Sequence, residues 1–481
     1  MAGGVTVLKK LFCLITSVTV LLCLSVTALA NSAQTYWSGV DRSGAIVNEE
    51  NCPLVVEGEK LSFDIPEFPQ NYYQTAEDYL NYSASVTAEY TFKNPADYKV
   101  NATLVFPFGR APDYACYDEE KGYSYDGEKF DVVVNSKAIK KKLRHTFYSY
   151  DEFDYKTEST KLKDNYTSDE FFSPDTPVKV YVFEPSGIDE AYFLDYDSPY
   201  ISAPLATNPD KTRILLSDCI SYDYRDDNVY AGLYPENNIS FTMYVIGEDI
   251  DFDVDWTVYE NASAEKEIGG EVKLLFTDDS TFEDIALMFH RGESGISEVD
   301  WYNALVDKIN YYEYEYGFLG SDYEFMIGQE LMRWYEYELS VEPKQTITNT
   351  VTAPIYPTIN GDYEPPKYEY KYLLSPAQNW ADFKKLDIEI NSQYYLIKSN
   401  LGKFKHSGDK YTLSLDSLPK KECEFTLCSA TKPKKISRPI SLRTILPIIM
   451  FGLFLLIPIA IIVVLVSVIV DSRKRKKKKK E

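Results

Sequence analysis

The stretch "SVTAEYTFKNPADYKVNATLVF", residues 85–106, decides the fold class. In its first part apolar residues alternate with polar ones, as in a strand with one buried face. Residues 94–97 then supply Asn, Pro and Asp, which are typical of turns, and the alternation resumes after them. The stretch therefore predicts an antiparallel hairpin with one solvated face.

Short alternating segments of the same kind recur between clusters of Gly, Pro, Asn and Asp. They are residues 130–134, 178–183, 239–245, 386–390 and 411–415. The abundant Tyr (41) and Phe (25) residues suit half-buried strands. A mainly β fold is expected, with an ectodomain built from antiparallel β-sandwiches.

The middle of the chain has helical periodicity instead. Residues 281–292, "TFEDIALMFHRG", begin with a Thr that can cap a helix and end at a Gly. A second helix is expected from Ser297, because apolar residues follow it at helical spacing as far as Tyr312.

Two further capping patterns predict helices. Ser321 and Glu324 form a capping box, so a third helix is expected over residues 327–334. Ser375 followed by Pro376 predicts a short helix that leads into a strand. Residues 281–339 are therefore expected to be helical and to separate two β regions.

Both ends of the chain carry membrane-targeting patterns. Residues 1–30 are expected to be a cleaved signal peptide, because lysines precede an apolar run that ends in "ALA". Residues 445–470 contain no charge and are long enough for one transmembrane helix. The polybasic tail at 471–481 then indicates a single-pass plasma-membrane protein with its N-terminus extracytoplasmic and its C-terminus cytoplasmic.

These features divide the chain linearly. We expect N-terminal β-rich domains at 31–260, a helical subdomain at 261–342, a C-terminal β domain at 343–430 and a basic linker at 431–444.

The extracytoplasmic part is expected to be strongly acidic. The whole chain has a net charge of −24, and its basic residues are concentrated near the C-terminal end. Such a surface repels nucleic acid, so no nucleic-acid partner is expected. Membrane lipid is the expected partner of the span and tail, and a protein or glycan is the expected partner outside.

No catalytic constellation stands out. His145, His290 and His406 are isolated in sequence, and no zinc-binding or phosphate-binding motif occurs. "GESGIS" around Ser294 resembles a nucleophile elbow but has Ile296 where the last Gly belongs. We therefore assign no catalytic, cofactor-binding or metal-ligating residue.

The stretch "GEDIDFDVDWTVYE", residues 247–260, has two interpretations. It contains Asp249, Asp251, Asp253 and Asp255. With Glu260 they approach the spacing of an EF-hand, but Val254 stands where a tight turn needs Gly, and the flanks are strand-like. Alternation instead favours the solvated face of a strand. Calcium binding outside the EF-hand type stays open as the alternative, and no other cofactor is expected.

Cysteine pairing is only partly constrained. Five cysteines follow the signal peptide: Cys52, Cys116, Cys219, Cys423 and Cys428. An odd number leaves at least one without an intramolecular partner. "CEFTLC" predicts a strand, which would hold the α carbons of Cys423 and Cys428 about 16 Å apart, too far for a disulfide.

Two segments resemble known families. "YEYKYLLSPAQNWADFKKLDIEI" (368–390) and "LPKKECEFTLC" (418–428) resemble an uncharacterised family of bacterial extracytoplasmic proteins with a C-terminal membrane anchor. "VTAEYTFKNPADYKVNATLVFPFG" (86–109) resembles the first strands of vault and inter-alpha-trypsin type domains. The resemblance implies a surface ectodomain and transfers no functional residue.

The expected function is that of a membrane-anchored binding or structural module for protein or glycan partners, without catalysis. One alternative is a carboxylate-based extracytoplasmic hydrolase, since two carboxylates suffice for glycoside chemistry. A calcium-dependent adhesin is the other.

Overall fold

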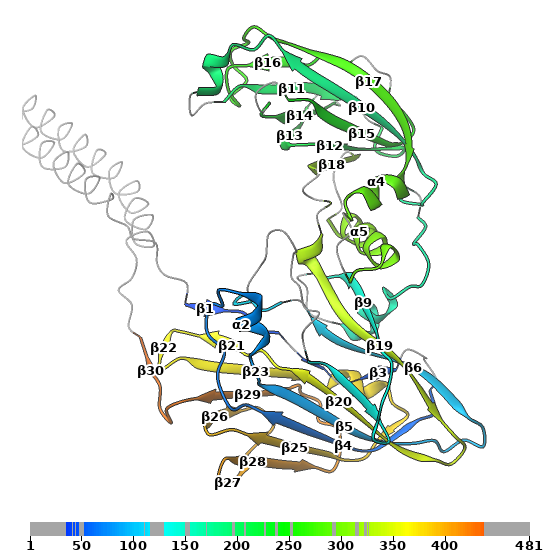
Figure 1. Cartoon of the computed structure of the whole chain (residues 1–481), viewed down its shortest axis with the longest axis vertical. Coiled ribbons are helices and arrows are strands. Elements are labelled where there is room, and N and C mark those ends of the chain that lie inside the picture. Colours follow the sequence, from blue (N-terminus) through cyan, green and yellow to red (C-terminus); the bar gives the residue numbers. More distant parts are fainter. Residues whose placement is uncertain are drawn as a thin grey trace, which may run out of the picture.

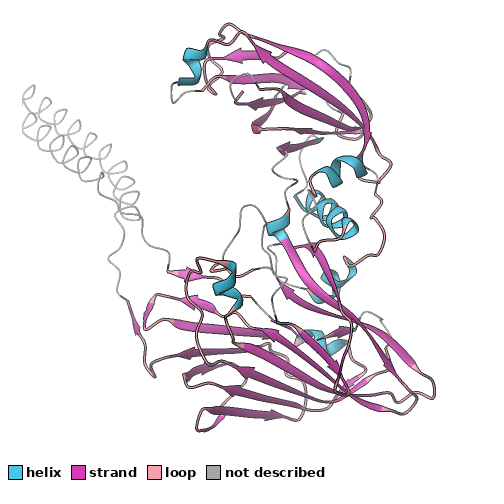
Figure 2. Ribbon diagram, viewed as in Figure 1, coloured by secondary structure: helices cyan, strands magenta, loops and turns pink. Residues whose placement is uncertain are grey.

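The computed structural model describes residues 35–436 except 41, 44, 48–51, 110, 116–128, 150–153, 170, 195–197, 206–207, 226–227, 236–238, 251–253, 291–294, 313–316, 322–324 and 326. In this part of the chain two β bodies are separated by a pair of helices (Figure 1). Strands dominate both bodies (Figure 2), as the mainly β expectation requires.

The large β body contains a nine-stranded and a six-stranded sheet. The nine-stranded sheet consists of β4 (Val55–Asp64), β5 (Ser85–Lys93), β7 (Asp131–Val134), β8 (Lys137–Ala138), β20 (Thr346–Pro354), β24 (Asp382–Phe383), β25 (Leu386–Asn391), β27 (Lys405–Ser407) and β28 (Lys410–Leu415). The six-stranded sheet consists of β1 (Tyr36–Trp37), β2 (Arg42–Ser43), β21 (Thr358–Asn360), β23 (Lys367–Leu373), β26 (Tyr395–Ser399) and β29 (Cys423–Cys428).

Two smaller sheets complete the large β body. One has four strands: β3 (Ile46–Val47), β6 (Val100–Gly109), β9 (Lys142–Phe147) and β19 (Leu331–Val341). The other pairs β22 (Tyr363–Glu364) with β30 (Lys434–Lys435).

The small β body is a second sandwich. Its five-stranded sheet consists of β10 (Pro177–Ser186), β12 (Thr212–Leu216), β15 (Phe241–Gly247), β17 (Glu271–Thr281) and β18 (Phe318–Ser321). Its four-stranded sheet consists of β11 (Tyr200–Leu205), β13 (Cys219–Arg225), β14 (Asn228–Leu233) and β16 (Thr257–Tyr259).

Helices are short apart from α5. The α-helices are α2 (Ala76–Leu80), α3 (Tyr155–Thr160), α4 (Phe282–Met288) and α5 (Glu298–Tyr312), and 3-10 turns occupy Glu190–Leu194, Gly328–Glu330 and Ser375–Asn379. Thr281 caps α4, because its hydroxyl accepts the N–H of Asp284 at 3.2 Å. Ser297 caps α5 in the same way through Asp300 N–H at 3.1 Å. Both helices expected before Tyr312 are confirmed.

The hairpin expected over residues 85–106 is wrong, although both of its strands form. β5 pairs with β4 and β20, whereas β6 pairs with β3 and β19, so the two strands belong to different sheets. Buried Asn94 fixes the connection between β5 in one sheet and β6 in the other, since its amide nitrogen donates to the carbonyls of Val341 and Glu342. Partners more than two hundred residues away thus outcompete the local turn.

The third helix, expected from Ser321 and Glu324, is also wrong. Residues 331–341 form β19, which is paired on both sides by β6 and β9. Those cross-strand pairs satisfy the backbone hydrogen-bonding groups of residues 331–341. Their stabilisation exceeds what a helix cap at Ser321 would contribute. The turn at Ser375 is a 3-10 helix rather than a capped α-helix, and its first N–H groups are accepted by the Glu422 carboxylate instead.

Strand pairing crosses the linear division expected at residues 261 and 343. β25, from the C-terminal part, lies parallel to β4 from the N-terminal part, and β20 lies between β5 and β7. The large β body therefore contains both ends of the described part of the chain, and the small β body and helices are inserted within it. No helix among the described residues is long and apolar enough to cross a membrane. The expected signal peptide (1–30), span (445–470) and tail (471–481) lie outside those residues.

Candidate functional site: a polar groove on the six-stranded sheet

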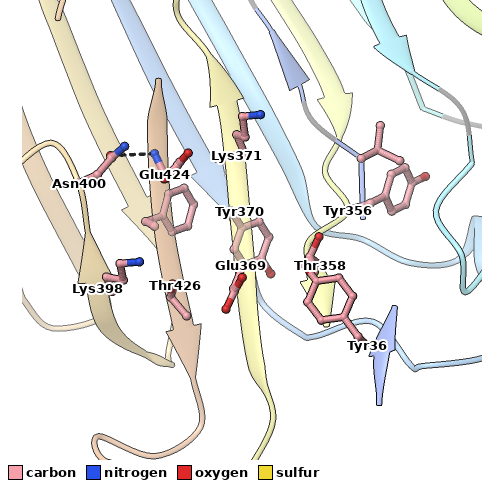
Figure 3. A pocket seen from close by; sticks show the side chains of 12 residues that line it. Tyr36, Tyr356, Thr358, Glu369, Tyr370, Lys371, Lys398, Asn400, Glu424 and Thr426 are labelled. Carbon is pink, nitrogen blue, oxygen red and sulfur yellow. Dashed lines mark hydrogen bonds between the residues drawn. The ribbon is translucent and has the colours of Figure 1, made fainter. Parts of the chain in front are cut away.

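A groove of about 310 Å³ lies on the outer face of the six-stranded sheet (Figure 3). Its lining comes from five strands or their ends: Tyr36, Val40, Tyr356, Thr358, Glu369, Tyr370, Lys371, Lys398, Asn400, Glu424, Phe425 and Thr426. Most of the lining side chains that face solvent are polar, and the exposed ring of Tyr36 stands at one side.

Antiparallel register arranges the polar side chains in two rows. In the first row Glu369 on β23 lies opposite both Thr358 and Thr426, and Thr426 lies opposite Lys398. Hydroxyl, carboxylate, hydroxyl and ammonium groups thus follow one another across four strands. Neighbouring strands are about 4.8 Å apart, so the row offers a polar group at each such step.

The second row lies two residues further along the strands. Lys371 is opposite Glu424, and Asn400 adjoins Glu424 through two hydrogen bonds. In these, Asn400 N–H donates to the Glu424 carbonyl at 3.1 Å, and Glu424 N–H donates to Asn400 Oδ1 at 3.0 Å. The rows are about 7 Å apart, because alternate residues of a strand share a face.

The opposite face of the same strands anchors the groove floor. Tyr370 and Phe425 stack at 5.0 Å in the core, and Phe63 of the facing sheet contacts Phe425 edge-on, also at 5.0 Å. Both residues next to Thr426 in sequence, Phe425 and Leu427, are also buried. The core residues therefore hold the backbone that positions Glu369, Glu424 and Thr426.

One wall of the groove is aromatic. Tyr36 is 51% exposed, and its ring stands at the edge of the sheet beside Thr358 (Figure 3). The wall needs Gly39, because a β carbon there would come within 2.5 Å of the backbone of Tyr356 and Pro357. A second hollow of about 260 Å³ shares Val40 and Thr358 with the groove, so a ligand can extend past the aromatic wall.

The charges in the groove balance locally. Glu369 and Glu424 are matched by Lys371 and Lys398, while the chain as a whole is strongly acidic. The Asn360 amide donates to Glu369 at 3.4 Å and orients its carboxylate. Such a surface offers both donors and acceptors to a ligand that carries little net charge.

A more open recess of about 590 Å³ lies at the edge of the same sheet. Its aromatic lining comprises Trp37, Tyr363 and Tyr368. The Tyr368 ring stacks on Phe68 at 3.7 Å, and the Lys367 ammonium lies 3.2 Å from the centre of the Tyr363 ring. These contacts occupy the aromatic faces, so the recess is the weaker candidate.

The aspartate stretch lies in the small β body, far along the chain from the groove residues. Asp249 accepts from the Tyr181 hydroxyl at 2.7 Å and from the N–H of Ile250 at 2.9 Å. The described residues from 248 to 256 lie between β15 and β16 rather than in a strand, which corrects the strand interpretation there. Asp251 and Asp253 lie outside the described residues, and within the described part no three acidic, His or Cys side chains cluster as metal ligands.

The three histidines are separate, as the sequence indicated. His145 is buried in β9, His290 contacts the Ile296 carbonyl at 3.1 Å, and His406 stacks on Tyr411 at 4.2 Å. Ser294 lies outside the described residues.

Cys423 and Cys428 lie at the two ends of one strand, β29, as expected, and both are buried free thiols. Cys219 is also a free thiol, Cys52 is buried, and Cys116 lies outside the described residues.

Sequence reasoning did not find the groove. Its residues are spread from Tyr36 to Thr426, and only the pairing of β21, β23, β26 and β29 brings them together. The alternation in "KYEYKYL" and "CEFTLC" is a local signal that could have placed Glu369 with Lys371, and Glu424 with Thr426, on one face of each strand.

No protein-family model and no curated protein sequence matches the chain. Among solved structures, the chain is similar to the crystal structure of a putative nutrient binding protein from Legionella pneumophila. That protein has 10% sequence identity and a TM-score of 0.34, and the match covers 82% of this chain and 72% of the other.

Proposed function

We propose that the protein is a surface binding module whose groove holds a segment of a linear, uncharged glycan. The observation that carries this proposal is the pair of polar rows beside the exposed Tyr36 ring. Sugar hydroxyls act as donors and acceptors together, so they pair with carboxylates, ammonium groups, amides and hydroxyls placed side by side. The apolar face of a sugar ring can stack on an exposed aromatic side chain such as Tyr36.

Local charge balance narrows the ligand class. A polyanion would be repelled by Glu369, Glu424 and the acidic chain, and a polycation would be repelled by Lys371 and Lys398. An uncharged glycan is repelled by neither the glutamates nor the lysines of the groove.

Calorimetric titration of the full chain tests this proposal with cellohexaose, chitohexaose and maltohexaose as probes. At least one hexasaccharide should bind, and Tyr36→Ala and Glu369→Gln should each weaken its binding about tenfold. Tyr72→Ala is the matched control, because Tyr72 is a 65% exposed tyrosine that does not line the groove. Absence of binding by all three sugars, or equal binding by the groove variants, would refute the glycan proposal.

One observation favours a second function, hydrolysis by a carboxylate pair. Glu369 and Glu424 are diagonal neighbours on adjacent strands, so their side chains leave the same face of the sheet from α carbons about 7–8 Å apart. Inverting glycoside hydrolases hold their two carboxyl groups at about 6.5–9.5 Å. Release of reducing ends from the bound hexasaccharide, lost in both Glu369→Gln and Glu424→Gln, would support hydrolysis. Binding without any release would support the binding module.

The membrane location remains part of the proposal. Both ends of the described chain meet at Asp362: the Thr35 hydroxyl donates to its carboxylate at 3.2 Å, and the Ile436 N–H donates to its carbonyl at 2.7 Å. This contact supports attachment of the large β body to an anchor at 445–470 from one end. The full chain should stay in membranes after carbonate extraction, and an epitope added at the C-terminus should resist external protease. Release into the carbonate supernatant would count against the anchor.

A further inference from the structure

The strand β17 forms one edge of the five-stranded sheet in the small β body (Figure 1). Among the described residues it pairs only with β10, so its other edge presents unpaired backbone groups. β17 has 11 residues, which corresponds to about 37 Å of strand. Long edges of this kind are templates for a further strand.

Three consecutive apolar residues are exposed on this edge. Leu274, Leu275 and Phe276 are 41%, 47% and 54% exposed, on a strand whose other residues are mostly polar. Single exposed apolar residues are common on protein surfaces, but three in a row on an unpaired strand are not.

A β-bulge spreads these side chains around the edge. Leu274 lies opposite Phe183 and Phe276 lies opposite Val182, so the irregularity falls at Leu275. Phe183 faces the sandwich core, and Val182 belongs to the other face. Apolar side chains therefore flank the free backbone on both faces of the sheet.

Acidic groups border the apolar residues. Asp278 and Asp279 follow within three residues of Phe276, and Glu271 precedes Leu274. The lysines of β17 and of its neighbour β10 form ion pairs with two of these groups: Lys179 contacts Asp279 at 2.9 Å, and Lys273 contacts Glu271. The three carboxylates outnumber the two lysines, so the edge combines apolar side chains with a small excess of negative charge.

From this arrangement we infer that β17 docks an extended segment of a partner protein by strand addition, and that the segment carries consecutive large apolar residues flanked by Lys or Arg. Main-chain hydrogen bonds to the free edge supply affinity. Apolar residues of the partner cover Leu274 and Phe276, and its basic residues meet Asp278 and Asp279.

A second copy of this chain fits the edge poorly. Antiparallel self-pairing around Leu275 would set Glu271 against Asp279, and two chains of net charge −24 repel each other. Charge complementarity therefore favours a basic partner over a dimer.

Fluorescence anisotropy with the full chain tests the inference. The probe is a labelled peptide of sequence KKTVFVTK, and two control peptides replace its lysines by glutamates or its central Phe by Pro. The probe should bind at least tenfold more tightly than either control, since one control reverses the charge and the other breaks the strand.

Protein variants locate the site. Leu274→Ser with Phe276→Ser should weaken probe binding at least tenfold, whereas Ile239→Ser, at a 59% exposed apolar residue outside β17, should leave it unchanged. Because these side chains are exposed, the variants should keep the wild-type melting temperature. Three results would overturn the inference. The double variant could bind the probe as tightly as the wild type, or the acidic peptide could bind as tightly as the probe. Light scattering could also show a dimer that the double variant abolishes.

Discussion

Arg144 on β9 and Asp300 on α5 form an ion pair at 3.0 Å, and their side chains are only 2% and 3% exposed. The Asp300 carboxylate also accepts the backbone N–H of His145 at 3.0 Å. This contact fastens the helix between the two β bodies to the large body, because β9 pairs with β19 there.

Loss of this carboxylate should destabilise the protein strongly. Asp300→Ala leaves a buried guanidinium without its main partner, which costs about 3–5 kcal/mol of unfolding free energy. Urea unfolding followed by tryptophan fluorescence measures the loss. Asp164→Ala removes another Arg144 partner that is 77% exposed, so its cost should stay below about 1 kcal/mol. Equal losses of unfolding free energy in the two variants would contradict the assignment of Asp300 as the main partner of Arg144.

The buried carboxyl of Glu59 on β4 should make stability fall as pH rises. Burial raises its pKa from 4.5 to about 8, and the Tyr90 hydroxyl opposes part of that rise. Between these values the folded chain holds a proton that the unfolded chain releases. The free energy of unfolding therefore decreases by about 1.4 kcal/mol per pH unit over this window. Glu59→Gln should remove this slope in urea titrations at pH 5, 6, 7 and 8, and an unchanged slope would show that Glu59 does not cause it.

His145 should have the opposite effect at lower pH. Burial lowers its pKa from 6.5 to about 3, and the neighbouring Arg333 and Arg144 add to the decrease. The stabilisation is complete above pH 6.5 and is lost as pH falls towards 3, by about 1.4 kcal/mol per unit. His145→Asn should abolish this loss, and His406→Asn, at an exposed position, is the control. An NMR titration showing His145 protonated at pH 5 would disprove the assignment.

The thiol of Cys423 should be unreactive in the folded protein. Burial raises its pKa to about 12, and the carboxylates of Glu424 and Glu422 contribute. At pH 8 alkylation should be at least about a hundredfold slower than in urea, because the thiolate is both rare and inaccessible. Mass spectrometry of iodoacetamide-treated protein measures the rate. A peptide containing a Cys423–Cys428 disulfide would contradict both the strand and the free thiols.

Thr426 provides a test of the groove floor. Its side chain lies between Glu369 and Lys398 and is 7% exposed. Thr426→Val keeps the shape but removes a hydroxyl, so hexasaccharide binding should weaken about five- to tenfold. Thr412→Val on β28, in the other sheet, should bind like the wild type. A binding loss from Tyr36→Ala without one from Thr426→Val would place the ligand on the wall rather than on the floor.

Local sequence patterns were sufficient for several individual elements. The alternation in residues 85–93 predicted the buried face of β5, and the caps Thr281 and Ser297 predicted where α4 and α5 begin. The absence of a disulfide between Cys423 and Cys428 also followed from strand geometry. Each of these features depends on residues a few positions apart, which a sequence displays directly.

Which strands would become neighbours could not be predicted in the same way. β4 lies between β5 and β25, and β6 lies between β3 and β19, although the pairing segments are separated by up to several hundred residues. The misassigned helix after Ser321 has the same cause, since pairing with β6 and β9 makes residues 331–341 a strand.

The sequence by itself determined a mainly β, acidic chain with two capped helices, because alternation, capping and charge are local properties. Only the tertiary structure decided that Thr358, Glu369, Thr426 and Lys398 form one row, and that β17 is left with a free edge. Both sites depend on sheet order. Sheet order is set by long-range hydrogen bonding and core packing, which are not encoded in any single stretch of the chain.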